Sequence, residues 1–400
     1  MTGRPPEIRR MPQLLDRWTY RTTPTVVFGR GCLDELPDHV RRIADGPTLI
    51  VTDKGLVEAG VVERVTDELD RADIVATVWD EAEPEPPTVS VDACAQAIRE
   101  ANPAVVLGLG GGSPMDTSQI AACVVTNGGK AEDWIGVEVL RKPGIPTISI
   151  PTTAGTASEV TGNAVMVLPD RSNKLTVVSP FIYPQTALID PALTDSVPPH
   201  ITAATGMDTF CHAAESFITR RATQHTRQPA ADALRRTLEF LPRAVADGTD
   251  REARDQMAYA CLQAGYSLAN AGVILVHGLA HAIGARARIP HGVANTVCLL
   301  PVMRQAADRN PALVAELAVP LGVSADVTGA AERAQAAVGV MERLVDQVGL
   351  PTTLREVGVE RSWLPDVAAA TLSNTRVVHN SPVQSNAAEL TRLLEGSFAG

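Results

Sequence analysis

The stretch Leu107-Gly-Leu-Gly-Gly-Gly-Ser-Pro-Met-Asp116 decides how the first half of the chain folds. It overlaps an apolar run, residues 104–109, that is typical of a buried strand. Ser113 followed by Pro114 indicates the N-cap and first turn of a helix. Glycines let the backbone pass close to a bulky anion, and free N–H groups at a helix start bind phosphate. The stretch therefore predicts a strand, a tight turn and a helix. The glycines either bind a diphosphate or serve only the reversal of the chain, because tight strand-to-helix turns also use glycines structurally. Their spacing is not G-x-G-x-x-G, so this is not the usual dinucleotide fingerprint.

The same alternation of strand-like and helix-like segments runs through the first half of the chain. Buried strands are predicted at residues 48–53, 74–79, 104–109 and 147–150, with helices at 62–72 and 91–101. Such alternation favours a parallel sheet with helices on both faces. We therefore predict an α/β domain over residues 1–195, in which the Pro- and Arg-rich residues 1–17 form an extension.

The second half has a different pattern. From about Pro198 the sequence is helical nearly throughout, with long Ala-rich segments at 230–246, 251–286 and 325–348. We predict an all-α domain over residues 196–400, and a binding cleft between the two domains.

Composition limits the classes of partner. The chain has 400 residues, of which 45% are hydrophobic, and a net charge of −11. This charge argues against nucleic acid or an anionic membrane as a general partner. No apolar run is long enough to span a bilayer, and the first residues lack the apolar core of a signal peptide, so we expect a cytoplasmic protein. The six cysteines show no C-x-x-C spacing and are expected to be reduced and buried.

Histidines are concentrated in the second half. His277-Gly-Leu-Ala-His281 is followed by His291, and upstream Asp208 stands four residues before His212. On a helix, residues four apart share a face, so each pair presents two polar groups in one direction. The structural alternative is that each buried histidine only bonds a carboxylate within the core. Three imidazoles and one carboxylate, without thiolate, favour Fe(II) or Zn(II) over Mg or Ca.

Two further polar groups follow predicted strands. Asp53 ends an early strand, where a carboxylate either bonds a ribose diol or caps the helix that begins near Lys54. The threonines and Ser158 of Pro151-Thr-Thr-Ala-Gly-Thr-Ala-Ser-Glu159 either line a ligand or fold a hydroxyl-capped turn.

Together these motifs resemble those of the iron-dependent (group III) alcohol dehydrogenases. The Gly110–Asp116 turn, the Pro151–Val160 loop, Asp208-x-x-x-His212 and the segment from His277 to Asn295 occur in the order and at the spacing of that family. The resemblance covers the chain from about Thr25 to the last thirty residues, and it is strongest to the branch that contains lactaldehyde reductase (propanediol oxidoreductase).

The resemblance implies a Rossmann-like domain that binds NAD(P) and a helical domain that holds the metal, iron or alternatively zinc. The implied metal ligands are Asp208, His212, His277 and His291, and His281 is implied to lie near the nicotinamide as a proton relay or positioning group. The implied cofactor residues are Asp53 at the ribose, Gly111, Gly112 and Ser113 at the diphosphate with Asp116 in the same motif, Thr152, Thr153 and Thr156 beside them, and Asn163 and Lys174 near the nicotinamide.

We therefore expect a metal-dependent, NAD(H)-linked alcohol dehydrogenase or aldehyde reductase, acting on a small alcohol or aldehyde and assembled as a homodimer. Two alternatives share the architecture: a lyase like dehydroquinate synthase, which uses NAD and a metal without net redox, and an assembly module without catalysis.

The sequence departs from that branch at three places. Glu85-Pro-Pro-Thr88 replaces a turn with Asn, Leu268 stands where relatives often carry a pocket Phe, and Arg286-Ala-Arg288 replaces an aromatic segment. Arginine binds carboxylates and phosphonates bidentately. Arg286 or Arg288 is thus a candidate to hold the anionic end of an aldehyde, unless both are solvated or ion-paired.

Overall fold

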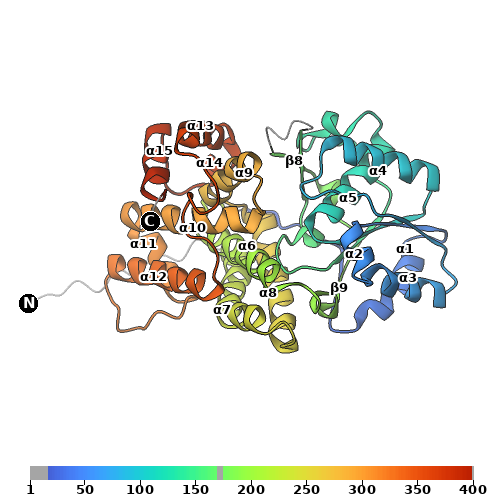
Figure 1. The fold of residues 1–400 in the computed structure, drawn as a ribbon, viewed down its shortest axis with the longest axis horizontal. Helices are drawn as coiled ribbons and strands as arrows, with labels where there is room; N and C mark the ends of the chain where they lie inside the picture. Colours follow the sequence, from blue (N-terminus) through green and yellow to red (C-terminus); the bar gives the residue numbers. More distant parts are fainter. Residues whose placement is uncertain (1–16, 169–173, 399–400) are drawn as a thin grey trace, which may run out of the picture.

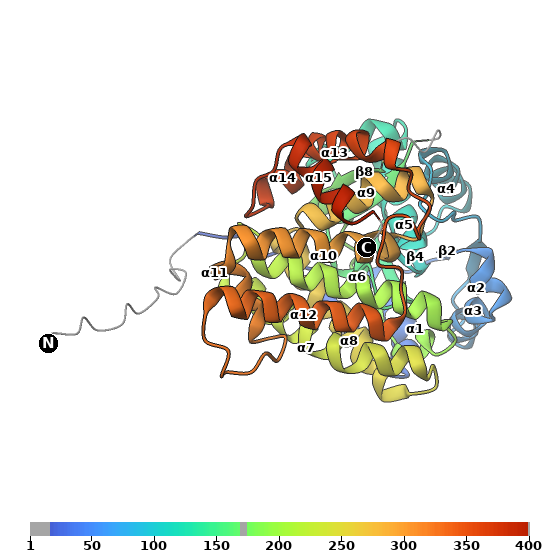
Figure 2. The same cartoon turned by 60° about the vertical axis from the view of Figure 1, so that its left-hand side comes forward.

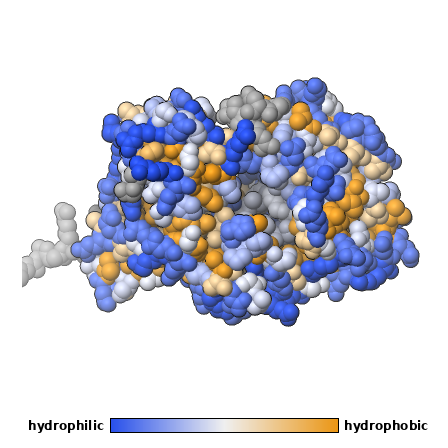
Figure 3. All heavy atoms as spheres, viewed as in Figure 1, coloured by the Kyte–Doolittle hydropathy of each residue, from blue (hydrophilic) through white to orange (hydrophobic). Residues whose placement is uncertain are grey.

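The computed structural model describes residues 17–168 and 174–398, in which the strands lie on one side of the molecule and the helices from Pro199 onward lie on the other (Figure 1). Except for Arg17, the predicted extension lies outside the described residues. Hydrophilic residues cover much of the face seen in Figure 3, with smaller hydrophobic patches between them.

A six-stranded parallel sheet forms the centre of the first half. Its strand order is β1-β9-β6-β4-β2-β3. The strands are β1 (Thr25–Phe28), β2 (Thr48–Val51), β3 (Ala76–Trp79), β4 (Val105–Gly110), β6 (Thr147–Pro151) and β9 (Thr186–Ile189). The four predicted strands are present, but β3 is partly exposed rather than buried as predicted. Every residue of β2, β4, β6 and β9 is buried, because the sheet is covered on both faces.

Helices cover both faces of this sheet, as predicted. Ile50 packs in a core with α1 and α3, whereas its neighbours Leu49 and Val51 pack in a second core with α4 and α5 on the other face. The helices are α1 (Leu36–Ile43), α2 (Lys54–Glu58), α3 (Val61–Arg71), α4 (Thr88–Ala101) and α5 (Gly112–Asn127).

A second, three-stranded sheet was not predicted. It contains β5 (Gly136–Val137), β7 (Asn163–Val167) and β8 (Lys174–Val178), and β7 and β8 pair antiparallel. The pairing places Asn163 opposite Val178 and Lys174 opposite Val167. Asn163 and Lys174 therefore lie at opposite ends of one strand pair.

From Pro199 to the end of the described residues, the regular structure is helical. The helices are α6 (Pro199–Ile218), α7 (Gln224–Ala246), α8 (Arg251–Ala271), α9 (Leu275–Ala287), α10 (His291–Arg309), α11 (Pro311–Val314), α12 (Ala330–Val348), α13 (Leu364–Ser373), α14 (Thr375–Asn380) and α15 (Ala387–Gly396). Short 3-10 helices occur at Cys32–Glu35, Ala131–Trp134, Ser158–Val160, Pro180–Ile182, Pro191–Thr194, Ala315–Ala318 and Arg361–Trp363. Helix α10 packs against both α6 and α12, and the three helices share one core (Figure 2).

The transition between the two halves lies in a short segment. The last strand ends at Ile189, a 3-10 turn covers Pro191–Thr194, and α6 begins at Pro199. We propose that this segment is the domain boundary. The boundary predicted from the sequence, between residues 195 and 196, lies within it. The side chain of Arg254 joins α8 to this segment by donating to the Val197 carbonyl oxygen at 2.8 Å.

The prediction of one helical segment over residues 251–286 was wrong. The chain breaks at Gly272, which has a φ of +75°, and α8 and α9 meet at 102°. Glycine adopts this backbone conformation without the penalty of a side chain. The break changes the direction of the chain before α9, in which His277 Nε2 lies 3.5 Å from Asp208 Oδ1.

No single helix among the described residues is long and apolar enough to cross a membrane, although α8 and α9 satisfy that test as a bent pair. The six cysteines are free and buried, as predicted.

The close approach of α10 to α6 yields a testable prediction. A Cβ atom at Gly292 would lie 1.9 Å from the backbone oxygen of Ala204, and backbone cannot yield as a flexible side chain can. Gly292→Ala should therefore force α6 and α10 apart and destabilise the fold by about 2 kcal/mol or more. Denaturant unfolding measures the change.

Gly339→Ala in α12 is the matched control, because the nearest atom to its added Cβ is Arg343 Nη1 at 3.6 Å. This variant should be neutral, or more stable by up to about 1 kcal/mol through helix propensity. Equal stability of the two variants would show that the α6–α10 contact tolerates a side chain.

Candidate metal centre and cofactor site

Three helices bring the predicted metal ligands together. Asp208 and His212 lie on α6, His277 lies on α9, and His291 is the first residue of α10. The Nε2 atoms of His212, His277 and His291 lie 3.6, 3.5 and 3.7 Å from Asp208 Oδ1. These distances are too long for good hydrogen bonds. They are close to the roughly 3.4 Å expected between two ligand atoms that each lie about 2.1 Å from one tetrahedral ion.

The tightest group consists of Asp208, His277 and His291, whose ligand atoms all lie within 4.8 Å of one another. His212 approaches Asp208 and stacks on His277, with ring centroids 4.6 Å apart. The ring centroid of His281 lies 6.2 Å from that of His277 and 5.2 Å from that of His291. The His281 ring therefore lies beside this group.

The electrostatics of the group favour a cation. Burial alone would raise the pKa of Asp208, yet His212, His291 and His277 hold it well below its usual value. Burial lowers the pKa of His212 and, more strongly, that of His291, so both imidazoles are neutral. Burial opposes charge on His277 as well, but Glu215 and Asp208 raise its pKa to about 9. His212 and His291 are thus in the deprotonated state that divalent metals require of their ligands, whereas His277 would have to release its proton when a metal binds.

Asn295 lies among these ligands and was not predicted as a site residue. It stands one turn after His291, and its Nδ2 lies 2.7 Å from Asp208 Oδ1, 3.2 Å from His277 Nε2 and 3.3 Å from His291 Nε2. Its Oδ1, His212 Nδ1 and His291 Nδ1 are buried without a hydrogen-bond partner. The ligand atoms thus already gather around a group of partial positive charge, and the residues present fit a divalent metal.

Glu215 is a second site residue that sequence reasoning missed. Its carboxylate contacts His277 Nδ1 and accepts the backbone N–H of Ile274 at 2.7 Å. A carboxylate behind a ligating imidazole fixes the ring and raises its basicity. The signal was present in the sequence, because Glu215 follows Asp208 by seven residues on an apolar helix and so shares its face.

The carboxyl edge of the parallel sheet carries the predicted cofactor residues. Asp53 caps α2 by accepting the Leu56 N–H at 3.1 Å, so the capping alternative for this residue is observed. Ser113 is not the N-cap of α5, which begins at Gly112 after Gly111. No side chain caps this helix start, which leaves its N–H groups to a ligand. The Ser113 hydroxyl instead accepts the Glu85 N–H at 3.1 Å.

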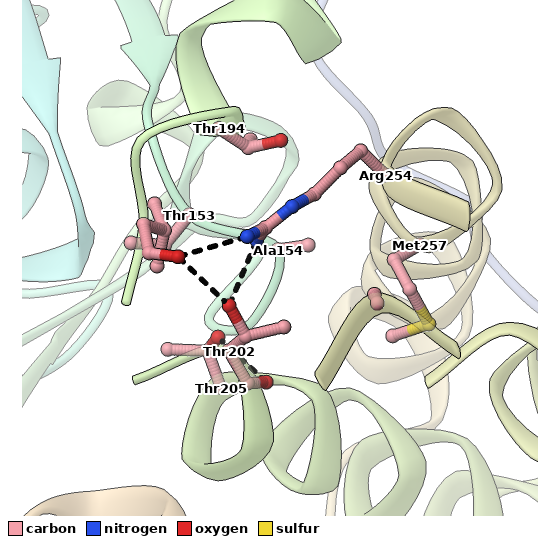
Figure 4. Close-up of a pocket in the computed structure, with 9 residues that line it drawn as sticks. Thr153, Ala154, Thr194, Thr202, Thr205, Arg254 and Met257 are labelled. Carbon is pink, nitrogen blue, oxygen red and sulfur yellow. Dashed lines mark hydrogen bonds between the residues drawn. The ribbon is translucent and has the colours of Figure 1, made fainter. Parts of the chain in front are cut away.

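The threonine loop packs against the glycine turn. A Cβ atom at Gly112 would lie 2.8 Å from Thr156 Cγ2, and one at Gly111 would lie 3.4 Å from Thr153 Oγ1. Thr152 is buried and joins β6 to β4 through a 2.9 Å bond from its N–H to the Gly110 oxygen. Figure 4 shows Thr153 in the wall of a small cavity at the domain junction, beside the Arg254 side chain.

The remaining predicted cofactor residues have partners within the chain. Asp116 is buried and accepts the Val165 N–H at 2.8 Å, so it joins α5 to β7, and burial raises its pKa to about 7. Asn163 Oδ1 accepts a bond from Arg376 at 3.1 Å.

Lys174 pairs with Glu85 and reaches α9, since its Nζ lies 3.4 Å from the Cβ position of Gly284. Figure 1 shows β8 and α9 at the junction of the two halves.

The arginines proposed to bind an anionic substrate do not fit that role. Arg286 pairs with Asp366 at 2.9 Å and lies over the Trp363 ring, at 4.8 Å from its centroid. Arg288 is exposed and ends α9. Both have the solvated or ion-paired environment of the alternative interpretation.

The role of Glu215 is testable by removing its charge. Glu215→Gln keeps the shape of the side chain but weakens the support of His277, so metal affinity should fall about 10- to 100-fold. Competition against a chromophoric chelator measures the affinity.

Glu159→Gln is the control, because Glu159 is another buried carboxyl group, with a pKa raised by burial to about 7, and has no contact with the histidines. An equal loss of affinity in both variants would remove the specific role of Glu215.

Comparisons with known proteins agree with this geometry. The family model "Iron-containing alcohol dehydrogenase" matches residues 23–191, and the model of the C-terminal part of the Fe-containing alcohol dehydrogenase family matches residues 202–398. The chain is 38% identical to lactaldehyde reductase of Escherichia coli (strain K12) over 356 residues, which are 88% of this chain and 92% of the relative.

Solved structures match over nearly the whole chain. A 1,3-propanediol oxidoreductase is 32% identical, with a TM-score of 0.92 over 96% of this chain and 100% of the other. Sulfoacetaldehyde reductase of Bifidobacterium kashiwanohense, solved in complex with NAD+, is 30% identical, with a TM-score of 0.86 over 96% and 99%. The chain therefore belongs to the iron-containing alcohol dehydrogenase family.

Proposed function

We propose that this protein interconverts small primary alcohols and aldehydes with NAD(H) and a bound divalent metal. The observation that carries the proposal is the gathering of Asp208, His277 and His291 within 4.8 Å, with His212 beside them. Relatives described as lactaldehyde reductase and 1,3-propanediol dehydrogenase support a small alcohol or aldehyde as substrate.

Asp208, His212, His277 and His291 would hold the metal. When bound, a divalent ion supplies Lewis acidity toward the oxygen of the alcohol or aldehyde. The family assignment supports Fe(II), and the same donor set also suits Zn(II). Glu215 keeps Nδ1 of His277 occupied, so that Nε2 faces Asp208.

NAD is the cofactor that the first domain supports best. The uncapped start of α5 offers N–H groups to a diphosphate, and Gly111 and Gly112 leave room beside Thr153 and Thr156. Asn163 and Lys174, at the two ends of the β7–β8 pair, are proposed at the nicotinamide end. The neighbour solved with NAD+ supports this choice.

His281 has the properties of a proton-handling or positioning group. Burial lowers its pKa well below the usual value, and His291 and Lys174 add to this effect. Its imidazole is therefore neutral, and one ring nitrogen is free to accept a proton. We propose that it acts beside the nicotinamide and outside the metal ligands.

A lyase like dehydroquinate synthase would show no net oxidation of NADH, and a silent assembly module would show no turnover. The relatives described as dehydrogenases and reductases favour the oxidoreductase. An aldehyde panel with NADH, after loading with Fe(II) without oxygen, tests the proposal, and no turnover with any aldehyde would contradict it.

Substitution of the two histidines of α9 should affect different properties of the enzyme, namely metal content for His277 and turnover for His281. His277→Ala removes a ligand and should lower metal content after dialysis against a chelator. His281→Ala should lower kcat with metal content unchanged. Metal analysis beside steady-state kinetics distinguishes them, and loss of metal in His281→Ala would make His281 a ligand.

Asp53 should set the preference between cofactors. A carboxylate accepts bonds from the ribose hydroxyls of NAD and repels a 2′-phosphate, so NADH should be preferred. Asp53→Asn retains a good helix cap for α2 while it removes the charge, and Asp53→Gly removes the side chain.

Both Asp53 variants should narrow the NADH-to-NADPH ratio of kcat/KM, mainly by improving NADPH. Lys54, next in the chain, would offset part of the repulsion. Comparable efficiency of the unmodified enzyme with both cofactors would remove this role of Asp53.

A further inference from the structure

A cavity of about 510 Å3 lies where the two halves of the molecule meet. Its walls include Val137, Asn163 and Val178 of the small sheet on one side, and Ala269 of α8 and Arg376 of α14 on the other. The cavity is therefore built by both halves of the chain, which is where ligands of two-domain proteins commonly bind.

The charge lining this cavity is mostly positive. Arg21, Arg221, Arg376 and His379 line it, whereas the acidic group in its wall is Glu138, which pairs with Arg21 at 3.1 Å. Within residues 17–168 and 174–398, neither Arg221 nor Arg376 has a carboxylate at ion-pair distance. Two uncompensated guanidinium groups at one cavity are notable in a chain with 46 acidic and 35 basic residues.

Arg376 is the more enclosed of these two groups. It lies in α14, and its Nη2 donates to Asn163 Oδ1 at 3.1 Å. Burial lowers the pKa of Arg376, and the nearby Arg221 lowers it further. A cation that loses water without gaining a carboxylate is costly for the fold. An anionic ligand would offset this cost, because a guanidinium binds carboxylate and sulfonate oxygens through two parallel N–H groups.

The position of Arg376 connects this cavity to the proposed reaction site. The next residue, Val377, packs against α9 at Gly278, with its Cγ1 3.2 Å from that Cβ position, and Gly278 follows the ligand His277. On the other wall, Asn163 begins β7, whose Val165 N–H is held by Asp116 of α5. The guanidinium thus lies between the helix that carries metal ligands and the strand proposed at the nicotinamide.

We propose that Arg376 is a specificity-determining residue that binds a carboxylate or sulfonate group at the far end of a short aldehyde, while Arg221 adds positive charge to the same cavity. This inference rests on the proposed aldehyde reductase function, and it assigns to Arg376 the role that the sequence suggested for Arg286 or Arg288. The Asn163 side chain holds the guanidinium in place, and two of its N–H groups can face the anion.

A matched pair of substrates tests the inference. Succinic semialdehyde carries a terminal carboxylate, and pentanal is a neutral aldehyde of similar length. The Fe(II)-loaded enzyme with NADH should show a higher kcat/KM for the charged aldehyde. Arg376→Gln should lower the charged-to-neutral ratio of kcat/KM about tenfold or more, mainly through KM, because it removes a charge-assisted hydrogen bond. Arg376→Lys should retain part of the preference, since it keeps the charge and loses the planar fork.

Arg288→Ala is the matched control, because it removes one positive charge from an exposed position outside the cavity wall. Its ratio should equal that of the unmodified enzyme. Calorimetric titration with butyrate provides a readout that does not depend on turnover: binding should weaken in Arg376→Gln and stay unchanged in Arg288→Ala.

Two results would overturn the inference: no preference for the charged aldehyde in the unmodified enzyme, or equal effects of the Arg376 and Arg288 variants. Absence of NADH turnover with both aldehydes would contradict the proposed function instead. In that case the butyrate titration would still decide whether Arg376 binds an oxyanion.

Discussion

The contact between the Glu215 carboxylate and His277 holds the helical half in its functional arrangement. After the chain turns at Gly272, the first N–H groups of α9 have no earlier turn of helix to bond, and Glu215 accepts those of Ile274 and His277. The same carboxylate contacts the His277 ring and points its other nitrogen toward Asp208. One buried side chain therefore supports the start of α9 and the orientation of the His277 ring. Without it, the helix start would carry buried, unpaired donors.

The two halves of the molecule contribute different chemical groups to the site. The α/β half offers backbone N–H groups and glycines at the carboxyl edge of a parallel sheet, which suit a diphosphate. The helical half offers a carboxylate and imidazoles within an apolar core, where low polarity strengthens every charge interaction. The Asp208 charge is tolerated there because several imidazoles and an amide surround it. A site at the junction needs both halves to be packed against each other.

Sequence reasoning predicted the features that depend on local pattern. The buried strands were found because sheets covered on both faces give continuous apolar runs, and the cluster of Asp208 and the histidines because polar residues four apart on an apolar helix are conspicuous. Features that depend on tertiary contacts were missed. The break at Gly272 lies within the segment 251–286 that was predicted to be helical, and Ser113 was predicted to be a cap although Gly111 takes that place. Arg286 and Arg288 stand near the histidines in sequence, whereas the fold brings Arg376 to the cavity from much farther along the chain.

The β7–β8 pair has a consequence for how specificity can change. Its pairing fixes Asn163, which holds Arg376, at one end and Lys174, which contacts Glu85 near the glycine turn, at the other. A strand advances about 3.3 Å per residue, so this pair sets a fixed distance between the Asn163–Arg376 contact and the Lys174–Glu85 contact. Amino-acid substitutions within the β7–β8 pair would change the contacts at both of its ends. Their effects would combine non-additively with those of substitutions at Arg376. Evolution or design that alters the length of the accepted substrate would therefore have to change the β7–β8 pair and its two end contacts together.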